Sequence, residues 1–267
     1  MLGSVKSEQR WQWGAYGKHP VSRDFFRIGR DFPLMKNFSE WVEKGYTMLA
    51  SKSKGIGKSC SWRFWAKGLR KEFLVCGLVR DSSDRLGRPY PLLVMGTGIL
   101  KRWEDQWDLL PFACEKTWDQ VEYLSAQRYN DFTKLEVDVS NIRSPYSEWQ
   151  EFKTKRESSL EFVEKLEDTS FQDLRDLEDL ASKMSKKTEC FVCLDNKLFQ
   201  NQTVLINYWH VLFNTHPHAV PSAIFMGGTI ERAYLVLFRR PLTPVDFAHL
   251  WSVTFPESMG SDSLFSR

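Results

Sequence analysis

Long hydrophobic stretches are missing from this sequence. The chain has 267 residues, 42% of them hydrophobic, but no apolar run approaches the roughly 18 residues that a membrane-crossing helix needs. The first residues, MLGSVKSEQRW, contain no apolar core of the kind found in signal peptides. We therefore expect a protein that does not insert into a membrane and that resides in the cytoplasm.

Cysteine is scarce and odd in number, with five residues at positions 60, 76, 114, 190 and 193. Cys76 and Cys190 lie inside apolar, strand-like runs, which predicts buried thiols and not disulfides. The pair Cys190 and Cys193 lacks a second cysteine pair that would complete a zinc site. Alternation along a strand would also place its two sulfurs on opposite faces. We expect core packing here and no bound metal.

Recognisable catalytic motifs are also lacking. The segment Gly55–Ser59 (GIGKS) is similar to the end of a phosphate-binding loop, but Lys52 stands where that motif needs its first glycine, so a basic surface loop is favoured. His210, His216 and His218 match no metal-binding spacing, and no G-x-S-x-G motif is present. Because the members of a catalytic triad need not be close in sequence, a hydrolase or a nucleotide-binding enzyme on an α/β fold stays the alternative function.

The net charge is only +3, but the charges are unevenly distributed. Residues 1–70 carry 14 Lys and Arg against 5 Asp and Glu, whereas residues 101–186 carry 13 against 20. Such polarity could steer a charged partner or be satisfied within the fold. The aromatic residues of the basic part follow helix or strand spacing, which indicates a core, and no nucleic-acid-binding signature is present. We expect no nucleic-acid partner.

Hydrophobic periodicity indicates strands interleaved with helices. Strands are expected at 11–16, 61–66, 73–79, 91–97, 133–139, 190–194, 223–226 and 233–238, and helices at 34–50, 116–128, within 147–187 and after 243. The last two strands should form a hairpin around Gly227-Gly228. The final helix should have Thr243 as its N-cap, Pro244 in its first turn and Asp246 in a capping box. This order predicts a layered α/β/α sandwich with a mixed, largely antiparallel sheet and a helical insertion.

Internal repeats and low-complexity linkers are absent from the sequence, so we expect one compact unit. Its parts would be an N-terminal α/β region at 1–140, a charged helical segment at 141–189 and C-terminal strands with a helix at 190–253. Residues 254–267 would form a flexible tail.

Three segments combine arginine, aspartate, glycine and proline with aromatic residues: Gly17–Phe25 (GKHPVSRDF), Ser61–Phe64 (SWRF) and Ser83–Leu92 (SDRLGRPYPL). The third lies between two expected strands, so Asp84, Arg85 and Arg88 should lie at one end of the sheet, where these strands end. Guanidinium groups can bind a carboxylate through two parallel hydrogen bonds. The cluster is therefore either an ion-paired network that holds strand ends together, with Gly87 in a turn conformation, or an exposed surface that docks a partner.

These segments resemble the N-terminal signature of the TagF family, also called ImpM, which is associated with type VI secretion. The matching residues are Gly17, Lys18, Pro20, Asp24 and Phe25 in the first segment, Trp62, Arg63 and Phe64 in the second, and Asp84, Arg85, Gly87, Arg88, Tyr90, Pro91 and Leu92 in the third. The C-terminal segments 221–228 and 240–247 are similar to that family's closing strand, turn and helix. One departure is Arg23, which stands where the family has a glycine.

The resemblance implies a layered α/β sandwich without a cofactor or metal. It implies a non-enzymatic regulator that represses assembly of the type VI secretion system after translation, by binding the system's forkhead-associated scaffold protein. The candidate partner-binding residues are Lys18, Arg23, Asp24, Arg63, Asp84, Arg85 and Arg88.

Overall fold

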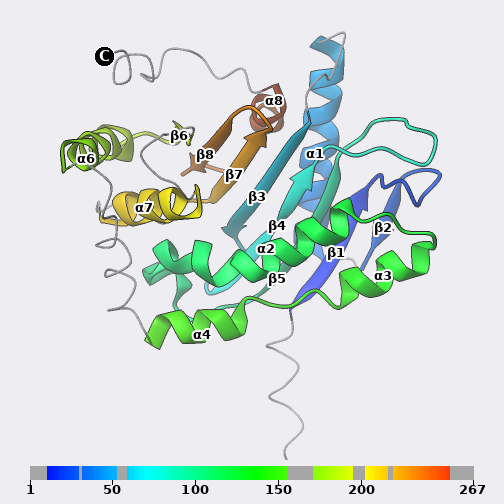
Figure 1. Ribbon diagram of the computed structural model, residues 1–267, viewed down its shortest axis with the longest axis horizontal. Helices are drawn as coiled ribbons and strands as arrows, with labels where there is room; N and C mark the ends of the chain where they lie inside the picture. The colour runs from blue at the N-terminus through cyan, green and yellow to red at the C-terminus, as the bar shows by residue number, and fades with distance from the viewer. Residues whose placement is uncertain are drawn as a thin grey trace, which may run out of the picture.

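A single eight-stranded sheet forms the centre of the structure (Figure 1), a computed structural model that describes residues 11–29, 32–52, 59–154, 171–194, 202–215 and 219–252. The strands are β1 (Gln12–Gly17), β2 (Phe26–Ile28), β3 (Cys60–Lys67), β4 (Phe73–Arg80), β5 (Leu92–Ile99), β6 (Glu189–Cys193), β7 (Ala223–Thr229) and β8 (Ala233–Phe238). Their spatial order is β2-β1-β5-β4-β3-β7-β8-β6, and each of these neighbouring pairs is antiparallel. The fold is thus α/β with an antiparallel sheet.

Helices cover both faces of this sheet, as Figure 1 shows. They are α1 (Pro33–Lys52), α2 (Leu110–Ala126), α3 (Phe132–Ser140), α4 (Tyr146–Thr154), α6 (Phe171–Ser185), α7 (Gln202–Thr215) and α8 (Pro244–Ser252), with short 3-10 turns η1 (Trp103–Asp105) and η2 (Trp107–Leu109) before α2. One face is covered by α1 and α8, and the other by α2, α3 and α7. The sheet is therefore the middle layer, and its central strands are buried on both sides.

The face beneath α1 and α8 has an aromatic core. Phe64 of β3 stacks against Phe38 of α1 and Phe225 of β7, with ring centroids 5.3 and 5.4 Å apart. Trp41 of α1 meets Phe247 of α8 edge-on at 5.2 Å. Buried aromatic pairs of this kind add about 0.5–1.5 kcal/mol each beyond the area they bury. The stack therefore holds α1 and α8 together on the sheet.

Helix α8 begins as its sequence predicts. The Asp246 carboxylate accepts a hydrogen bond from the Thr243 backbone N–H at 2.6 Å, which is the returning half of a capping box, and Pro244 is the first helical residue. Arg240 binds both oxygens of the same carboxylate at 2.7 Å. The Trp41 indole N–H donates to the Thr243 carbonyl, 202 residues away along the chain.

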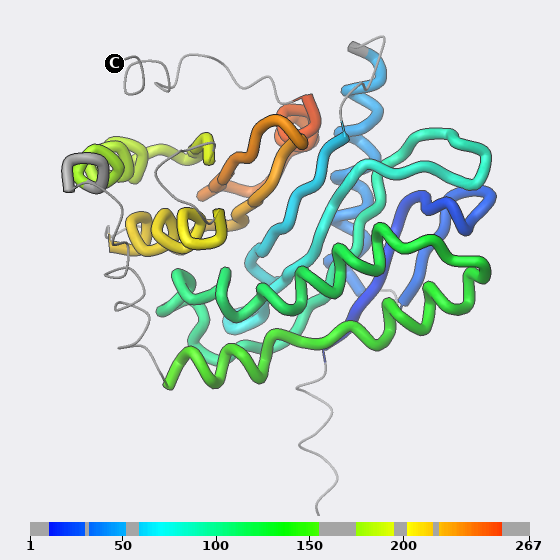
Figure 2. The backbone as a smooth tube through the Cα atoms, in the orientation of Figure 1, coloured from blue at the N-terminus to red at the C-terminus, as the bar shows by residue number. Residues whose placement is uncertain are grey.

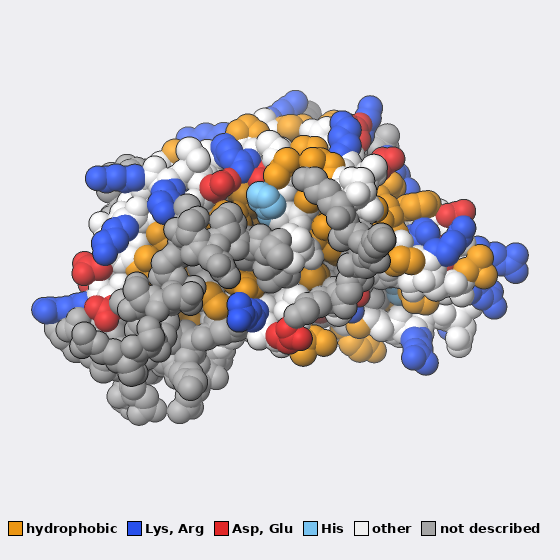
Figure 3. All heavy atoms as spheres, turned by 90° about the horizontal axis from the view of Figure 1, so that it is seen from above, with side chains coloured by type: hydrophobic (Ala, Val, Ile, Leu, Met, Phe, Trp, Pro, Cys, Tyr) orange, Lys and Arg blue, Asp and Glu red, His pale blue; other side chains and the backbone are white. Residues whose placement is uncertain are grey.

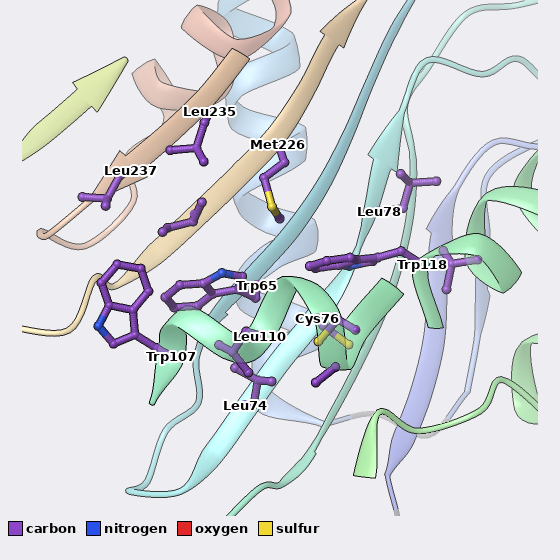
Figure 4. Packing of buried hydrophobic residues seen from close by; sticks show 14 of the residues in the cluster. Trp65, Leu74, Cys76, Leu78, Trp107, Leu110, Trp118, Met226, Leu235 and Leu237 are labelled. Carbon is purple, nitrogen blue, oxygen red and sulfur yellow. The ribbon is translucent and has the colours of Figure 1, made fainter. Parts of the chain in front are cut away.

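The opposite face contains a cluster of tryptophans around Trp65 of β3 (Figure 4). Its ring lies 5.6 Å from that of Trp103 and 5.7 Å from that of Trp107. Its indole N–H donates to Nε2 of His210 at 3.2 Å, while Nδ1 of His210 lies 2.8 Å from the Ile206 carbonyl and donates to it. Burial lowers the pKa of His210 to about 4, so the imidazole is neutral and serves as a structural linker between β3 and α7.

Most of the expected elements are present, and several expectations need correction. The expected strand at 133–139 is wrong, because these residues lie in helix α3, whose N-cap Asp131 accepts a hydrogen bond from the Thr133 N–H at 3.0 Å. The hairpin near the C-terminus exists, but Gly227 and Gly228 lie within β7 and the connection follows Thr229. Helix α2 begins at Leu110, earlier than expected, and α7 and β2 were not expected at all.

Several sequence expectations fall outside the described residues. These are most of the basic loop 51–60, the middle of the helical stretch 147–187, His216 and His218, and the tail 254–267. No helix in the described ranges combines the length and the hydrophobicity needed to cross a bilayer. Cys190 is buried as expected, but Cys193 is exposed, so the expectation of core packing is wrong for Cys193. The two residues lie on opposite faces of β6, as the alternation of a strand predicts.

Candidate partner-binding site

Two loops lie next to each other at one end of the sheet, at the right in Figure 2. Residues 18–25 connect β1 to β2, and residues 81–91 connect β4 to β5. The loops meet because β1 pairs with β5, which places Gly17 opposite Leu92. We refer to residues 18–25 and 81–91 as the paired loops. They contain six of the seven candidate residues.

Asp84 organises the second of the paired loops. Its side chain is fully buried, and its Oδ1 accepts hydrogen bonds from the backbone N–H of Leu86 at 2.9 Å and of Arg88 at 3.0 Å. The Gly87 N–H donates to the Asp84 carbonyl at 2.9 Å, closing a tight turn. Gly87 has φ of +77°, a conformation that glycine adopts at little cost. The carboxylate therefore accepts hydrogen bonds from backbone N–H groups that would otherwise have no partner within the turn.

The other oxygen of Asp84 joins the two loops through ion pairs. Oδ2 lies 3.0 Å from Nζ of Lys18 and 2.7 Å from Nε of Arg88. Arg88 extends further to the first loop, where its Nη2 donates to the Arg23 carbonyl at 2.8 Å and lies 3.7 Å from the Asp24 carboxylate. Two buried or half-buried cations thus share one buried anion, which satisfies the expectation of an ion-paired network.

Electrostatics keep Asp84 ionised. Burial alone raises the pKa of its carboxyl, but the hydrogen bonds from Lys18, from Arg88 and from the backbone N–H groups outweigh that effect and lower the pKa to about 2. At neutral pH the carboxylate is therefore charged and fully hydrogen-bonded. A buried carboxylate with this set of donors is a structural anchor, because no face of it is open to a partner.

Close backbone contact also explains Gly17, the last residue of β1. Its φ is +127°, and a Cβ placed on it would lie 2.0 Å from the carbonyl oxygen of Pro91. Any other residue would push β1 away from the beginning of β5. Gly17 therefore allows the paired loops to approach one another.

His19 fixes the first loop to the helical layer. It is 1% exposed, its Nδ1 accepts from the Val21 N–H at 3.2 Å, and its ring lies 5.6 Å from that of Tyr129 after α2. Burial lowers the pKa of His19, while a hydrogen bond to the backbone of Gln127 partly offsets this shift. The loop is thus bound on one side by the Asp84 network and on the other by the α2–α3 connection.

The outer side of the paired loops is different in character. Phe25 is 51% exposed and Leu86 is 72% exposed. Arg23 and Arg85 are exposed as well. Within the described ranges, their guanidinium groups form no hydrogen bond or ion pair, although the Arg85 backbone N–H donates to the Ser22 carbonyl at 2.8 Å. This surface therefore combines apolar side chains with arginines that the fold does not use.

Arg63 is the candidate residue that the structure places elsewhere. It lies on β3 and faces α2, where its Nε and Nη2 each lie 2.6 Å from the Glu122 carboxylate and its Nη2 lies 3.0 Å from Asp119. Glu122 and Asp119 lower the free energy of the charged guanidinium and raise its pKa, against the opposing effect of burial. Arg63 thus connects β3 to α2 and is separate from the paired loops.

The sequence predicts the cluster but does not show which of its residues are buried in the ion-paired network and which are exposed. Leu86 was not singled out, although an exposed leucine between Arg85 and Gly87 in a polar turn was a usable signal. The sequence does not show which arginine side chain turns inward to Asp84 and which turns outward to solvent, since Arg85 and Arg88 belong to the same motif. Across the described part of the chain, no three His, Cys, Asp or Glu side chains are grouped so that they could hold a metal ion.

Residues 14–142 match the family model described as the TagF N-terminal domain, type VI secretion system-associated. This region of the chain is therefore a TagF N-terminal domain. Both paired loops and Arg63 lie inside the TagF match, whereas the Arg240 and Asp246 pair lies beyond it.

A solved structure is also similar, that of PA0076 from Pseudomonas aeruginosa PAO1. It has 26% sequence identity and a TM-score of 0.40, and the match covers 50% of this chain. The matched part spans 63% of the length of PA0076. No match to a curated protein was found.

Proposed function

We propose that this TagF protein is a non-enzymatic, cytoplasmic regulator of the type VI secretion system. It represses assembly after translation by binding the forkhead-associated scaffold protein of that system. The observation that carries the proposal is the TagF match over residues 14–142, a domain described as type VI secretion-associated.

The geometry of the paired loops supports a binding role. Asp84, Lys18 and Arg88 hold the loops rigidly, and the side chains on the outer side, such as Phe25, are exposed. A surface that is ordered before binding loses less conformational entropy when a partner docks. Repression would then follow from occupancy, because a scaffold bound to TagF is withheld from the assembling apparatus.

The proposal is tested with purified proteins and with cells. The full chain is immobilised, and the purified forkhead-associated scaffold protein of the same bacterium is passed over it to measure a dissociation constant. In parallel, the gene is deleted and protein release through the type VI system is measured. We expect saturable binding, increased release in the deletion strain and reduced release when the protein is overproduced.

Each negative result has a defined meaning. If release falls in the deletion strain, the protein activates secretion and the repressor role is wrong. If no dissociation constant can be measured for the scaffold protein while other purified components of the apparatus bind, the partner is wrong and the association with type VI secretion stands.

A further inference from the structure

The candidate residues of the paired loops separate into an inner and an outer group. Lys18, Asp84 and Arg88 bind each other, and the side chains of Lys18 and Asp84 are 7% and 0% exposed. Arg23 and Arg85 face outward and have no such contacts with described residues. Lys18 and Asp84 are thus closed to a partner, and Arg88 is half-exposed but already engaged with Asp84, so the outer group offers the cations that the described part of the fold leaves free.

The backbones of the two outer arginines are fixed close together. The Arg85 N–H donates to the carbonyl of Ser22, which precedes Arg23, and the Arg23 carbonyl accepts from Arg88. The side chains of Arg23 and Arg85 therefore extend from neighbouring positions on the surface. Neither guanidinium group forms an ion pair with a described acidic residue; the neighbouring Asp24 carboxylate lies 3.7 Å from Arg88 instead. Two positive charges that are not paired within the fold favour a negatively charged partner.

An apolar centre accompanies these charges. Phe25 packs edge-on against Tyr90 at 4.5 Å, and the Lys18 ammonium lies 4.8 Å from the centre of its ring. The ring is thus held in place although half of it is exposed. Leu86 extends from the tip of the other loop and is the more exposed of the two. At the right-hand end of Figure 3, the end that contains the paired loops, Lys and Arg side chains surround hydrophobic ones.

We propose that Arg23, Phe25, Arg85 and Leu86 form a docking surface for an acidic segment of a partner protein that carries one apolar anchor residue. The acidic groups pair with Arg23 and Arg85, and the anchor packs on Phe25 and Leu86. This inference rests on the proposed function for the identity of the partner, but the chemistry of the surface can be tested without it. Central apolar contacts with a charged rim are the usual arrangement of protein interfaces.

The central experiment changes the outer side chains and leaves the inner group intact. In the double variant R23E/R85E, two attractive contacts become repulsive, so affinity for the purified scaffold protein should fall by about 100-fold or more. Leu86→Ser should weaken binding by about 5-fold or more, with little dependence on salt. Binding by the unaltered chain should weaken as the salt concentration rises, because salt screens exposed charges.

A matched control is available at the opposite end of the sheet. Leu69 and Arg70 lie in the connection between β3 and β4, where Leu69 is 61% exposed and Arg70 is exposed. The variant L69S/R70E introduces the same kinds of change as L86S combined with R85E. It should bind the scaffold protein as tightly as the unaltered chain. Melting temperatures should match across all of these variants, since none of the changed side chains is buried.

Synthetic peptides test the surface independently of the scaffold protein. Three short peptides of equal length are compared by NMR: glutamate and serine residues around one leucine, the same peptide without leucine, and a version with lysine in place of glutamate. We expect the first peptide to bind most tightly and to shift the amide signals of residues 22–25 and 84–88. Equal binding of the lysine peptide, shifts confined to other residues, or no binding of the first peptide would each overturn the proposed chemistry.

The two proposals fail in distinguishable ways. If the unaltered chain and R23E/R85E bind the scaffold protein equally, the docking surface is wrong and the regulatory function stands. If the unaltered chain binds no component of the apparatus but the acidic peptide binds at the paired loops, the function is wrong and the surface stands.

Discussion

Nζ of Lys18 lies 3.0 Å from Oδ2 of Asp84, and both side chains are almost completely removed from solvent. Lys18 directly follows β1, and Asp84 lies between β4 and β5. The two residues are 66 positions apart in the sequence, and the sheet brings their loops together. The ion pair then joins these loops directly. Breaking a buried ion pair by removing one partner is costly, because the other charge is left without compensation.

Replacing Asp84 by asparagine should therefore destabilise the protein. Asp84→Asn keeps the size of the side chain but leaves the Lys18 ammonium and the Arg88 guanidinium without their shared anion. We expect a clear decrease of the melting temperature in differential scanning calorimetry. Asp24→Asn is the control: its carboxylate is exposed and lies 3.7 Å from Arg88, so its loss should cost about 0–1 kcal/mol. Equal melting temperatures for the two variants would contradict the anchoring role of Asp84.

Acid should remove the contribution of Asp84. Its pKa in the folded protein is about 2, below the ordinary value of 3.8. The unfolded chain therefore takes up the proton first, and the stabilisation is present above about pH 4 and is lost as the pH falls toward 2. Urea unfolding of the unaltered chain and of Asp84→Asn between pH 7 and pH 2 should show two free energies of unfolding that converge at the acid end. A constant difference would mean that the carboxylate charge is irrelevant.

His210 should produce a second pH dependence, at higher pH. Its pKa falls from 6.5 to about 4 on folding because of burial, so the unfolded state binds the proton more tightly. The free energy of unfolding should decrease as the pH falls from about 6.5 to 4, by up to roughly 3 kcal/mol. In His210→Gln this part of the profile should become flatter, although the variant is less stable overall. An unchanged slope would show that other groups, such as His19, cause it.

Two glycines, Gly17 at the end of β1 and Gly87 in the second paired loop, should respond differently to substitution. Gly87 has φ of +77° with open space around its Cα, so Gly87→Ala should cost about 1–2 kcal/mol for backbone strain alone. Gly17→Ala adds a collision with the Pro91 carbonyl, and about 3 kcal/mol or more is expected. Chemical denaturation of both variants measures the difference. If both losses are the same, β1 and β5 separate more easily than their contact indicates.

A fragment that ends after residue 142 should fail to fold in isolation. It would retain β1 to β5 but would leave β3 without its partner β7, with Trp62 and Phe64 of β3 no longer covered by the C-terminal elements. An unpaired, apolar edge strand promotes association between chains. We expect aggregation in size-exclusion chromatography, whereas a chain ending after residue 252 should elute as a compact species. A monomeric, cooperatively melting short fragment would refute this.

The fold could be predicted where one local signal dominates. Strands β4 and β5 are continuous apolar runs, and α8 carries a proline and a capping carboxylate, so both types of element were predicted correctly. Helix α3 was mistaken for a strand because Thr133–Val139 alternates polar and apolar residues. Only Leu135 and Val139, four residues apart, are buried, while Val137 is 51% exposed. Tertiary packing against the sheet selected the helical period.

The site could be predicted only as a group of residues. That Asp84, Arg85 and Arg88 share a turn follows from their spacing. Which arginine binds the aspartate depends on the backbone of a tight turn, and the outward position of Arg85 follows from the same geometry. Arg63 could not be separated from the others, because its partner Glu122 lies 59 positions away on a helix whose register over β3 is not encoded locally.

The hydrogen bond between Trp41 and the Thr243 carbonyl has a consequence for the newly made protein. Helix α1 emerges from the ribosome early, but α8, which shares its core, is 202 residues away. Because translation proceeds at about 5–20 residues per second, about 10–40 s pass between the synthesis of α1 and that of α8. Throughout that interval the tryptophan and phenylalanine side chains of α1 have no finished core to enter, and a chaperone that shields them would raise the yield of native molecules.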